Sequence, residues 1–255
     1  VVEIAPSPSL SEKVRRSICE ASVELARSVG YVNAGTVEFL LNEAGDYYFI
    51  EMNTRIQVEH TVTEMITGID LVKSQIRIAE GCPLDTSEIG IASQDSIGKR
   101  GFAIQCRVTT EDPTHNFLPD YGRLTAYRSP AGFGIRLDGG TAFTGATITP
   151  FYDSLLVKIT SHSLTLEDAA RKMSRALSEF RVRGVKTNIP FLENVVRHPI
   201  FLAGQCTTRF IEDAPELSVY VARGDRATKL LEFISEITIN GNPDVPRALP
   251  RKTFR

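Results

Sequence analysis

Polar and apolar side chains alternate in the segment FIEMNTRIQVEH, residues 49–60. The odd-numbered positions from 51 to 59 are polar: Glu51, Asn53, Arg55, Gln57 and Glu59. In an extended chain these side chains lie on one face, whereas most even-numbered positions carry apolar side chains on the other. A face with carboxylates, an amide and a guanidinium has the groups needed to bind a metal ion and to move a proton.

A further carboxylate, Glu38, reaches this face through a predicted hairpin. The turn EAGD at residues 43–46 pairs Glu43 with Asp46, and this register places Glu38 directly opposite Glu51. Facing side chains on antiparallel strands have Cβ atoms about 5 Å apart, so two carboxylates there destabilise the sheet unless a cation lies between them. Carboxylate and amide oxygens suit magnesium or manganese. We therefore predict a metal site at Glu38, Glu51 and Asn53.

Each carboxylate alone also fits a simpler interpretation, a half-exposed strand with surface ion pairs. The combination of these residues favours a functional site. Asn53 is a poor strand former, and Glu38 lies in a run that otherwise has the pattern of a buried strand. Stability alone therefore does not explain why these two residue types occur at these positions.

Two other polar residues could take part in chemistry. Arg107 lies inside the apolar run FAIQCRV, where a guanidinium requires an anionic or carbonyl partner. That partner is either a functional anion or a structural carboxylate such as Asp153. His60 follows Glu59, but magnesium does not favour imidazole, so we interpret His60 as packed or hydrogen-bonded rather than as a ligand.

The elements that must position these residues follow from periodicity. Helical spacing of apolar residues predicts helices at 11–30, 69–80, 165–180, 188–197 and 225–234. Strands are expected at the start of the chain, in the hairpin of residues 35–60, and at 102–108, 123–128, 134–137 and 154–159. The end, residues 241–255, is proline-rich, basic and expected to be extended. The fold class is α+β, and the second half is mostly sheet.

Composition excludes several classes of protein. A formal net charge of −2 over 255 residues provides no broad electropositive surface for nucleic acid or an anionic membrane. No stretch approaches the roughly 18 apolar residues of a membrane span, and the first residues lack a signal pattern. We expect a cytoplasmic or organelle-matrix protein. The four cysteines lie far apart with no Cys-x-x-Cys pair, and we interpret them as buried thiols.

Long motifs resemble a known family. EMNTRIQVEH, preceded by GTVEF and followed by CRVTTEDP and FYDSLLVK, is similar to the biotin carboxylase component of biotin-dependent carboxylases, an ATP-grasp fold. FRVRGVKTNIPFL, APELS and DRATKLLEFISEITING narrow the resemblance to the pyruvate carboxylase branch. It implies the C-terminal half of an ATP-grasp domain at residues 1–92 and a biotin carboxylase C-terminal domain, mainly antiparallel sheet with helices, at 93–222. Residues 223–255 would form a helix and linker leading to an allosteric or tetramerisation region.

The resemblance also implies a reaction, the ATP- and magnesium-dependent carboxylation of biotin with bicarbonate through carboxyphosphate. Glu38, Glu51 and Asn53 would hold Mg²⁺ or Mn²⁺ at the ATP phosphates. Leu40 and Ile50, together with Glu38 and Glu51, would lie at the nucleotide.

The remaining roles concern bicarbonate and biotin. Arg55, Gln57, Val58 and Arg107 would bind bicarbonate, and Glu59 would remove its proton. Arg107 would also bind biotin and stabilise the negative charge on its ureido oxygen. Arg55, Glu59 and Arg107 are thus the expected catalytic residues.

Further partners follow from the same resemblance. Biotin would be attached to a carrier domain that is not in this chain, and pyruvate would be carboxylated to oxaloacetate at a separate domain. Arg181, Arg183 and Arg226 match positions that face an acetyl-CoA activator, although ordinary solvated charge explains them equally simply. Phe133 and Arg136 match a dimer interface within a homo-oligomer, expected to be a tetramer, or are surface residues.

The sequence lacks the family's glycine-rich lid and its carrier lysine, so we expect a fragment that is inactive alone. Two alternatives stay open. One is a biotin carboxylase that serves acetyl-CoA or propionyl-CoA carboxylation, against which the DRATKLLEF run argues. The other is a non-catalytic module for effector binding and dimerisation.

Overall fold

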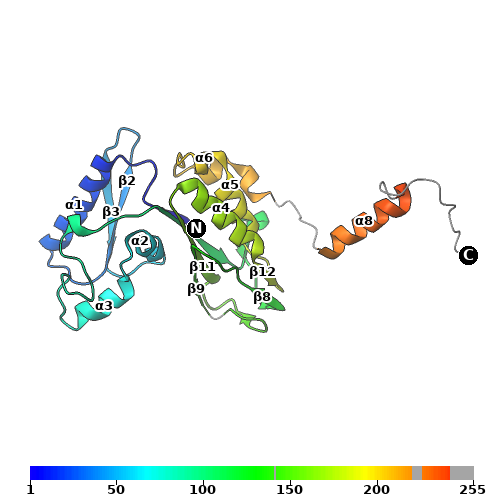
Figure 1. Cartoon of the computed structure of the whole chain (residues 1–255), viewed down its shortest axis with the longest axis horizontal. Coiled ribbons are helices and arrows are strands. Elements are labelled where there is room, and N and C mark those ends of the chain that lie inside the picture. The colour runs from blue at the N-terminus through cyan, green and yellow to red at the C-terminus, as the bar shows by residue number, and fades with distance from the viewer. Residues whose placement is uncertain (141, 220–225, 242–255) are drawn as a thin grey trace, which may run out of the picture. The chain divides into compact units, whose positions relative to one another are not determined.

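The computed structural model describes residues 1–140, 142–219 and 226–241. The chain divides into two compact units, Val1–Val219 and Tyr220–Arg255. The first unit contains the predicted metal and catalytic residues, and Figure 1 labels many of its helices and strands.

The first part of this unit contains the predicted hairpin and three helices. Its elements are β1 (Val2–Ala5), α1 (Glu12–Ser28), β2 (Thr36–Leu41), β3 (Tyr47–Asn53), α2 (His60–Thr67) and α3 (Leu71–Ala79). The helix expected at 11–30 is confirmed as α1, and the Ser11 side chain caps it by accepting a hydrogen bond from the Val14 backbone N–H. The helix expected at 69–80 is confirmed as α3, which Asp70 caps through Lys73.

The second part is mainly antiparallel sheet with helices packed on it, as expected. Its longer strands are β4 (Phe102–Thr109), β9 (Ile135–Gly139) and β11 (Leu155–Ser163). Its shorter strands are β5 (Glu111–Asp112), β6 (Leu118–Pro119), β7 (Gly122–Arg123), β8 (Ala126–Arg128), β10 (Thr147–Ile148) and β12 (Arg181–Arg183). The helices are α4 (Leu166–Glu179), α5 (Ile189–Arg197), α6 (Pro199–Leu202) and α7 (Phe210–Asp213). The single strand expected at 123–128 is wrong, because β7 and β8 are separate and pair with different strands.

The main sheet has the strand order β1-β4-β11-β9, and every neighbouring pair in it is antiparallel. Because side chains alternate along a strand, the sheet has two faces. One face is apolar and packs on α4 and α5; it includes Ile104, Cys106, Val108, Val157 and Ile159, all almost fully buried. This face forms the main hydrophobic core.

The opposite face of the same sheet is mostly polar and is covered by α2. Its positions include Gln105 and Arg107 on β4, Thr160 on β11 and Arg136 on β9. Figure 1 shows α2 and α4 on opposite sides of the sheet. The sequence did not reveal α2, and its position on a polar sheet face organises the candidate site.

The second unit contains α8 (Arg226–Asn240), which is longer than the helix expected at 225–234. The expected extended segment after residue 241 lies outside the described residues. The interpretation of all cysteines as buried thiols is wrong in part: Cys106 is buried, Cys19 and Cys82 are partly buried, and Cys206 is exposed. Within the described residues, no helix combines the length and apolar character needed to cross a bilayer.

Candidate active site

The hairpin brings two carboxylates together. Glu38 on β2 pairs directly with Glu51 on β3, as the sequence predicted. The predicted turn register is wrong, however, because Leu41 pairs with Tyr47 and the Asn42 backbone N–H donates to the carbonyl of Asp46. A one-residue register shift beside Glu38 corrects this offset and leaves Ile50 outside the pairing. The carboxylates therefore meet because of a bulge-type irregularity and not because of the turn.

Two side-chain amides hold the paired carboxylates. Asn53 Nδ2 donates to Glu38 Oε1 at 2.9 Å and to Glu51 Oε1 at 3.1 Å. Gln57 Nε2 donates to the same Glu38 oxygen at 2.9 Å. The positive ends of amide dipoles thus occupy the space between two like charges. This arrangement relieves part of the repulsion between the facing carboxylates.

The predicted extended conformation beyond Asn53 is wrong. β3 ends at Asn53, and a loop leads to α2, which begins at His60 with Glu59 as its N-cap residue. Arg55 is exposed, and its one hydrogen bond within the described part of the chain goes to the carbonyl of Ile56 at 3.2 Å. Gln57 bends back to Glu38, while Val58 is partly buried. The loop, rather than a strand, carries these residues past the carboxylate pair.

Glu59 and Arg107 form the second half of the site. Arg107 Nη2 lies 2.9 Å from Glu59 Oε2 and 3.2 Å from Glu3 Oε1. The suggested pairing of Arg107 with Asp153 is therefore wrong. Arg107 Nε is buried and has no hydrogen-bond partner among the described residues. The guanidinium is anchored through one terminal nitrogen by two carboxylates from different elements.

His60 is hydrogen-bonded, as expected, and belongs to a second buried contact of α2. Its Nδ1 lies 2.7 Å from the carbonyl oxygen of Gln57. One turn further, the buried Glu64 carboxylate accepts from the Leu71 backbone N–H at 2.6 Å and from Arg136, which also binds Asp138. The Asp138 and Glu64 carboxylates raise the pKa of Arg136. These contacts fix α2, and with it Glu59, on the sheet.

The other predicted residues lie on several different elements. Leu40 and Ile50 are about half exposed on the hairpin. Phe133 is 93% exposed, with the Lys172 ammonium 5.0 Å from its ring centroid. Arg181 and Arg183 are exposed on β12, whereas the side chain of Arg226 lies outside the described residues. The structure thus brings Glu38, Glu51, Asn53 and Gln57 into contact with one another, and it pairs Glu59 with Arg107.

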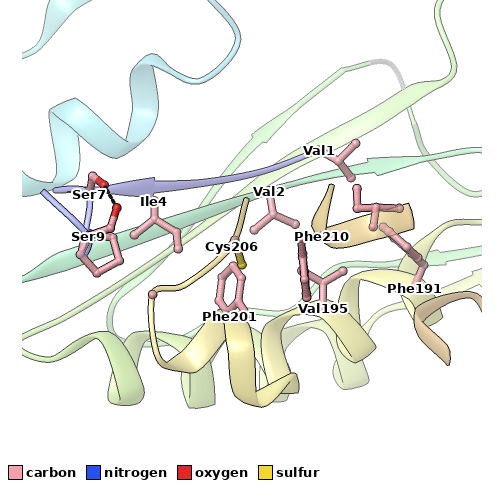
Figure 2. Close-up of a pocket in the computed structure, with 13 residues that line it drawn as sticks. Val1, Val2, Ile4, Ser7, Ser9, Phe191, Val195, Phe201, Cys206 and Phe210 are labelled. Carbon is pink, nitrogen blue, oxygen red and sulfur yellow. Dashed lines mark hydrogen bonds between the residues drawn. The ribbon is translucent and has the colours of Figure 1, made fainter. Parts of the chain in front are cut away.

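The cavity shown in Figure 2 does not belong to this site. It has a volume of about 330 Å³ and lies on the apolar side of β1, against Phe191, Phe201 and Phe210. Val2 and Ile4 point into it from β1, so the intervening Glu3 faces the other side. None of the predicted site residues lines the cavity.

Comparisons with known proteins agree with this geometry. The model of the family "Carbamoyl-phosphate synthase L chain, ATP binding domain" matches residues 1–87, and that of "Biotin carboxylase C-terminal domain" matches residues 105–213. Pyruvate carboxylase from Bacillus subtilis is 56% identical over 245 residues, which are 96% of this chain and 21% of that protein. The chain thus contains a match to a biotin carboxylase C-terminal domain, preceded by a match to an ATP-binding domain.

Solved structures show the same relationship at the level of the fold. A Rhizobium etli pyruvate carboxylase structure with the allosteric activator acetyl coenzyme-A superposes with a TM-score of 0.86 at 52% identity, over 100% of this chain and 26% of that one. The biotin carboxylase domain of a thermophilic 2-oxoglutarate carboxylase bound to bicarbonate gives 0.82 at 45% identity, over 87% of this chain and 48% of that one. This biotin carboxylase region spans about a fifth of the length of the curated relatives it matches.

The side chains present fit the divalent metal ion that the similarity to biotin carboxylases implies. Glu38 and Glu51 offer facing carboxylates, and Asn53 contacts both. Across the described residues, no three His, Cys, Asp or Glu side chains are grouped as a metal site. Asn53 is the amide that contacts both carboxylates, so its Oδ1 would be the third protein donor, in place of the Nδ2 group that now faces them.

Sequence reasoning missed three residues that support the site: Glu3, Gln105 and Thr61. Gln105 and Arg107 stand two residues apart in β4, and this spacing could have indicated a polar strand face. Glu3 interrupts an apolar strand in the same way. The register between β1 and β4 joins residues about a hundred positions apart, so no local signal could have paired them.

Proposed function

We propose that this chain is part of a carboxylase that uses ATP and bicarbonate to carboxylate biotin. The supporting observation is that one loop joins the Glu38–Glu51 pair to the Glu59–Arg107 pair. The first pair suits a metal at the ATP phosphates, and the second combines a base with a fixed cation. The relatives are pyruvate carboxylases, so we propose pyruvate as the final acceptor, at a separate domain.

The hairpin would serve the nucleotide. Glu38, Glu51 and Asn53 would hold magnesium or manganese, which when bound supplies positive charge to the ATP phosphates. Leu40 and Ile50, about half exposed on the same hairpin, offer apolar surface to the nucleotide. Gln57, in the loop proposed to bind bicarbonate, donates a hydrogen bond to Glu38. This contact would couple the position of bicarbonate to that of the nucleotide.

The loop and α2 would activate bicarbonate. Arg55, Gln57 and the Val58 backbone would orient the anion, and Arg55 has a guanidinium directed to solvent and available for this purpose. Glu59 would take the bicarbonate proton, so that a bicarbonate oxygen attacks the γ-phosphorus and ADP leaves. The product, carboxyphosphate, divides into carbon dioxide and phosphate, and the phosphate takes the proton of the biotin ureido nitrogen.

Arg107 would act in the second half-reaction. Biotin, delivered on a carrier domain, supplies the ureido nitrogen that accepts carbon dioxide. Arg107 would bind the ureido oxygen, where negative charge develops as the nitrogen loses its proton. Its contact with Glu59 supports this division of roles, because the proposed base for bicarbonate would then lie next to the proposed cation for biotin.

The exposed arginines support an anionic effector. Arg181 pairs directly with Arg128 across β12 and β8, and Arg183 lies two residues further along the same strand. Like charges at facing positions are destabilising, and a polyphosphate such as that of acetyl-CoA would neutralise them. The R. etli structure with acetyl coenzyme-A supports this choice of effector. Arg226 is the third arginine proposed for this role.

Assembly, domain limits and location are also proposed from the family. The exposed Phe133, together with Arg136, would contribute to a dimer of biotin carboxylase units within a tetramer. The ATP-grasp part would end near residue 92 and the biotin carboxylase C-terminal domain near residue 222. The four free cysteines suit the cytoplasm or the mitochondrial matrix.

Manganese titration tests this proposal directly. Calorimetry should detect one or more sites in the protein, and Glu51→Gln should weaken binding by at least about 10-fold, because it removes one of two anionic ligands. The matched control is Glu43→Gln, an exposed carboxylate in the turn of the same hairpin. Equal affinity in all three proteins would contradict the metal assignment and favour a non-catalytic module.

A further inference from the structure

A row of polar side chains crosses the sheet at a position where strands are usually apolar. Glu3 on β1, Gln105 on β4 and Thr160 on β11 are neighbours in register. Gln105 and Thr160 are fully buried, and so is Thr61 of α2, which lies over them. Buried polar groups are costly unless each has a hydrogen-bond partner, so the partners of each side chain in this row must be identified.

The hydrogen bonds of the row have only one possible direction. A carboxylate only accepts, so Gln105 Nε2 donates to Glu3 Oε2 at 2.9 Å. Gln105 Oε1 then accepts from the Thr61 hydroxyl. Since that hydroxyl has given its hydrogen, the Thr160 hydroxyl must donate to Thr61, at 2.8 Å. Every donor in the chain thus points toward Glu3.

The row ends at Arg107. Glu3 Oε1 lies 3.2 Å from Arg107 Nη2, while Glu3 Oε2 is held by Gln105. The Glu3 side chain is only 19% exposed, and Val2 and Ile4 on either side of it face the opposite cavity. Glu3 is therefore fixed by a buried hydrogen-bond chain and presents one oxygen to the guanidinium.

Arg107 has two carboxylate partners, and they differ in what surrounds them. Glu59 caps α2 and makes no side-chain capping bond, so only Arg107 binds its carboxylate among the described residues. In the proposed reaction Glu59 takes up a proton and loses its charge. At that moment Glu59 no longer holds Arg107 electrostatically. A second carboxylate that takes no part in the proton transfer would keep the guanidinium in place for biotin.

The geometry points to Glu3 as a positioning residue for Arg107. This inference rests on the proposed biotin carboxylase function and adds a residue to it. Glu3 touches no substrate; it keeps the Arg107 guanidinium oriented while Glu59 changes protonation state. The Thr160–Thr61–Gln105 chain holds Glu3, and the unpartnered Nε of Arg107 leaves the guanidinium dependent on these Nη2 contacts.

The test uses Glu3→Gln in the complete carboxylase that contains this chain. The amide oxygen of the substituted side chain can still accept from Gln105, but the side chain presents no anion to Arg107. We expect the rate of biotin carboxylation to fall at least about 10-fold, the scale of a misplaced catalytic group, with the KM for ATP unchanged. Glu3→Asp, which keeps the charge on a shorter stem, should recover part of the rate. Glu20→Gln, an exposed arginine-paired carboxylate on α1, is the control.

A double-mutant cycle separates positioning from stability. If Glu3 acts only through Arg107, Glu3→Gln combined with Arg107→Gln should match Arg107→Gln alone within about twofold. Losses that multiply, or a Glu3→Gln rate equal to that of the control, would overturn the inference. Should Arg107→Gln itself leave biotin carboxylation intact, the proposed function fails instead. Should Glu3→Gln not fold, Glu3→Asp takes its place in the same cycle.

Discussion

Glu38 and Glu51 face each other on adjacent strands, and a single side-chain amide, that of Asn53, is hydrogen-bonded to both. The amide relieves part of the repulsion, but it carries no net charge. The pair is therefore a site of stored electrostatic strain, which a divalent cation would relieve.

Removing one of the two charges should stabilise the metal-free protein. Glu51→Gln is expected to raise the free energy of unfolding by up to about 1 kcal/mol, since a like-charged pair becomes a pair with a single charge. Thermal unfolding with and without manganese measures this. The wild-type protein should gain more stability from the ion than the variant does. A destabilised metal-free variant would contradict the strain argument.

Glu59→Gln should abolish most of the carboxylation activity of the complete enzyme. A general base contributes on the order of 10²- to 10⁴-fold, and glutamine cannot accept the bicarbonate proton. The rate of bicarbonate-dependent ATP cleavage is the measurement, with Glu43→Gln as control. A near-normal rate in the variant would remove Glu59 from its proposed role.

Thr61→Val should destabilise the protein because it breaks the buried polar row. Gln105 Oε1 would lose its donor and Thr160 its acceptor, both in fully buried positions, at a cost of about 1–3 kcal/mol. Thr63→Val on the exposed side of the same helix should change stability by less than about 0.5 kcal/mol. Chemical denaturation of the two variants provides the comparison, and equal midpoints would refute the prediction.

Asp112 should contribute stability that depends on pH. The Lys186 ammonium, and after it the Thr114 hydroxyl and the His115 ring, hold the Asp112 pKa well below its ordinary value of 3.8. A depressed pKa means that the contribution is complete above the ordinary value and declines as the pH falls below it. Asp112→Asn should therefore destabilise the protein at pH 7, and the difference from wild type should shrink below about pH 4.

Unfolding midpoints in urea between pH 7 and pH 3 measure this dependence. Asp85→Asn, which changes an exposed aspartate, is the control and should show no comparable trend. A destabilisation by Asp112→Asn that stays constant over the whole range would show that packing, and not charge, explains its effect.

The helices that pack on an apolar face could be predicted from the sequence. α1, α4 and α5 lie within a few residues of their expected limits, because apolar periodicity and capping residues such as Ser11 and Thr165 agree. α2 was missed for a physical reason. It is only eight residues long and buries Thr61 and Glu64 together with Val62 and Ile66, so polar side chains interrupt its apolar pattern and weaken the helical signal.

The candidate site was predictable to the extent that its contacts are local. Glu38 and Glu51 belong to one hairpin, whose short connection restricts the possible registers. The partners of Arg107 could not be predicted in this way, because Glu59 approaches from a helix cap and Glu3 from a strand at the other end of the chain. Such contacts depend on how β1, β4 and α2 assemble.

The unpaired Ile50 separates the hairpin into two independent segments. Its outer segment, from Phe39 to Phe49 with the turn, has one register, and its inner segment, which includes Glu38 and Glu51, has another. A deletion of one residue from the outer segment could be absorbed by losing the irregularity, without moving either ligand. A change of one residue in the length of the hairpin tip would therefore leave the pairing of Glu38 with Glu51 unchanged.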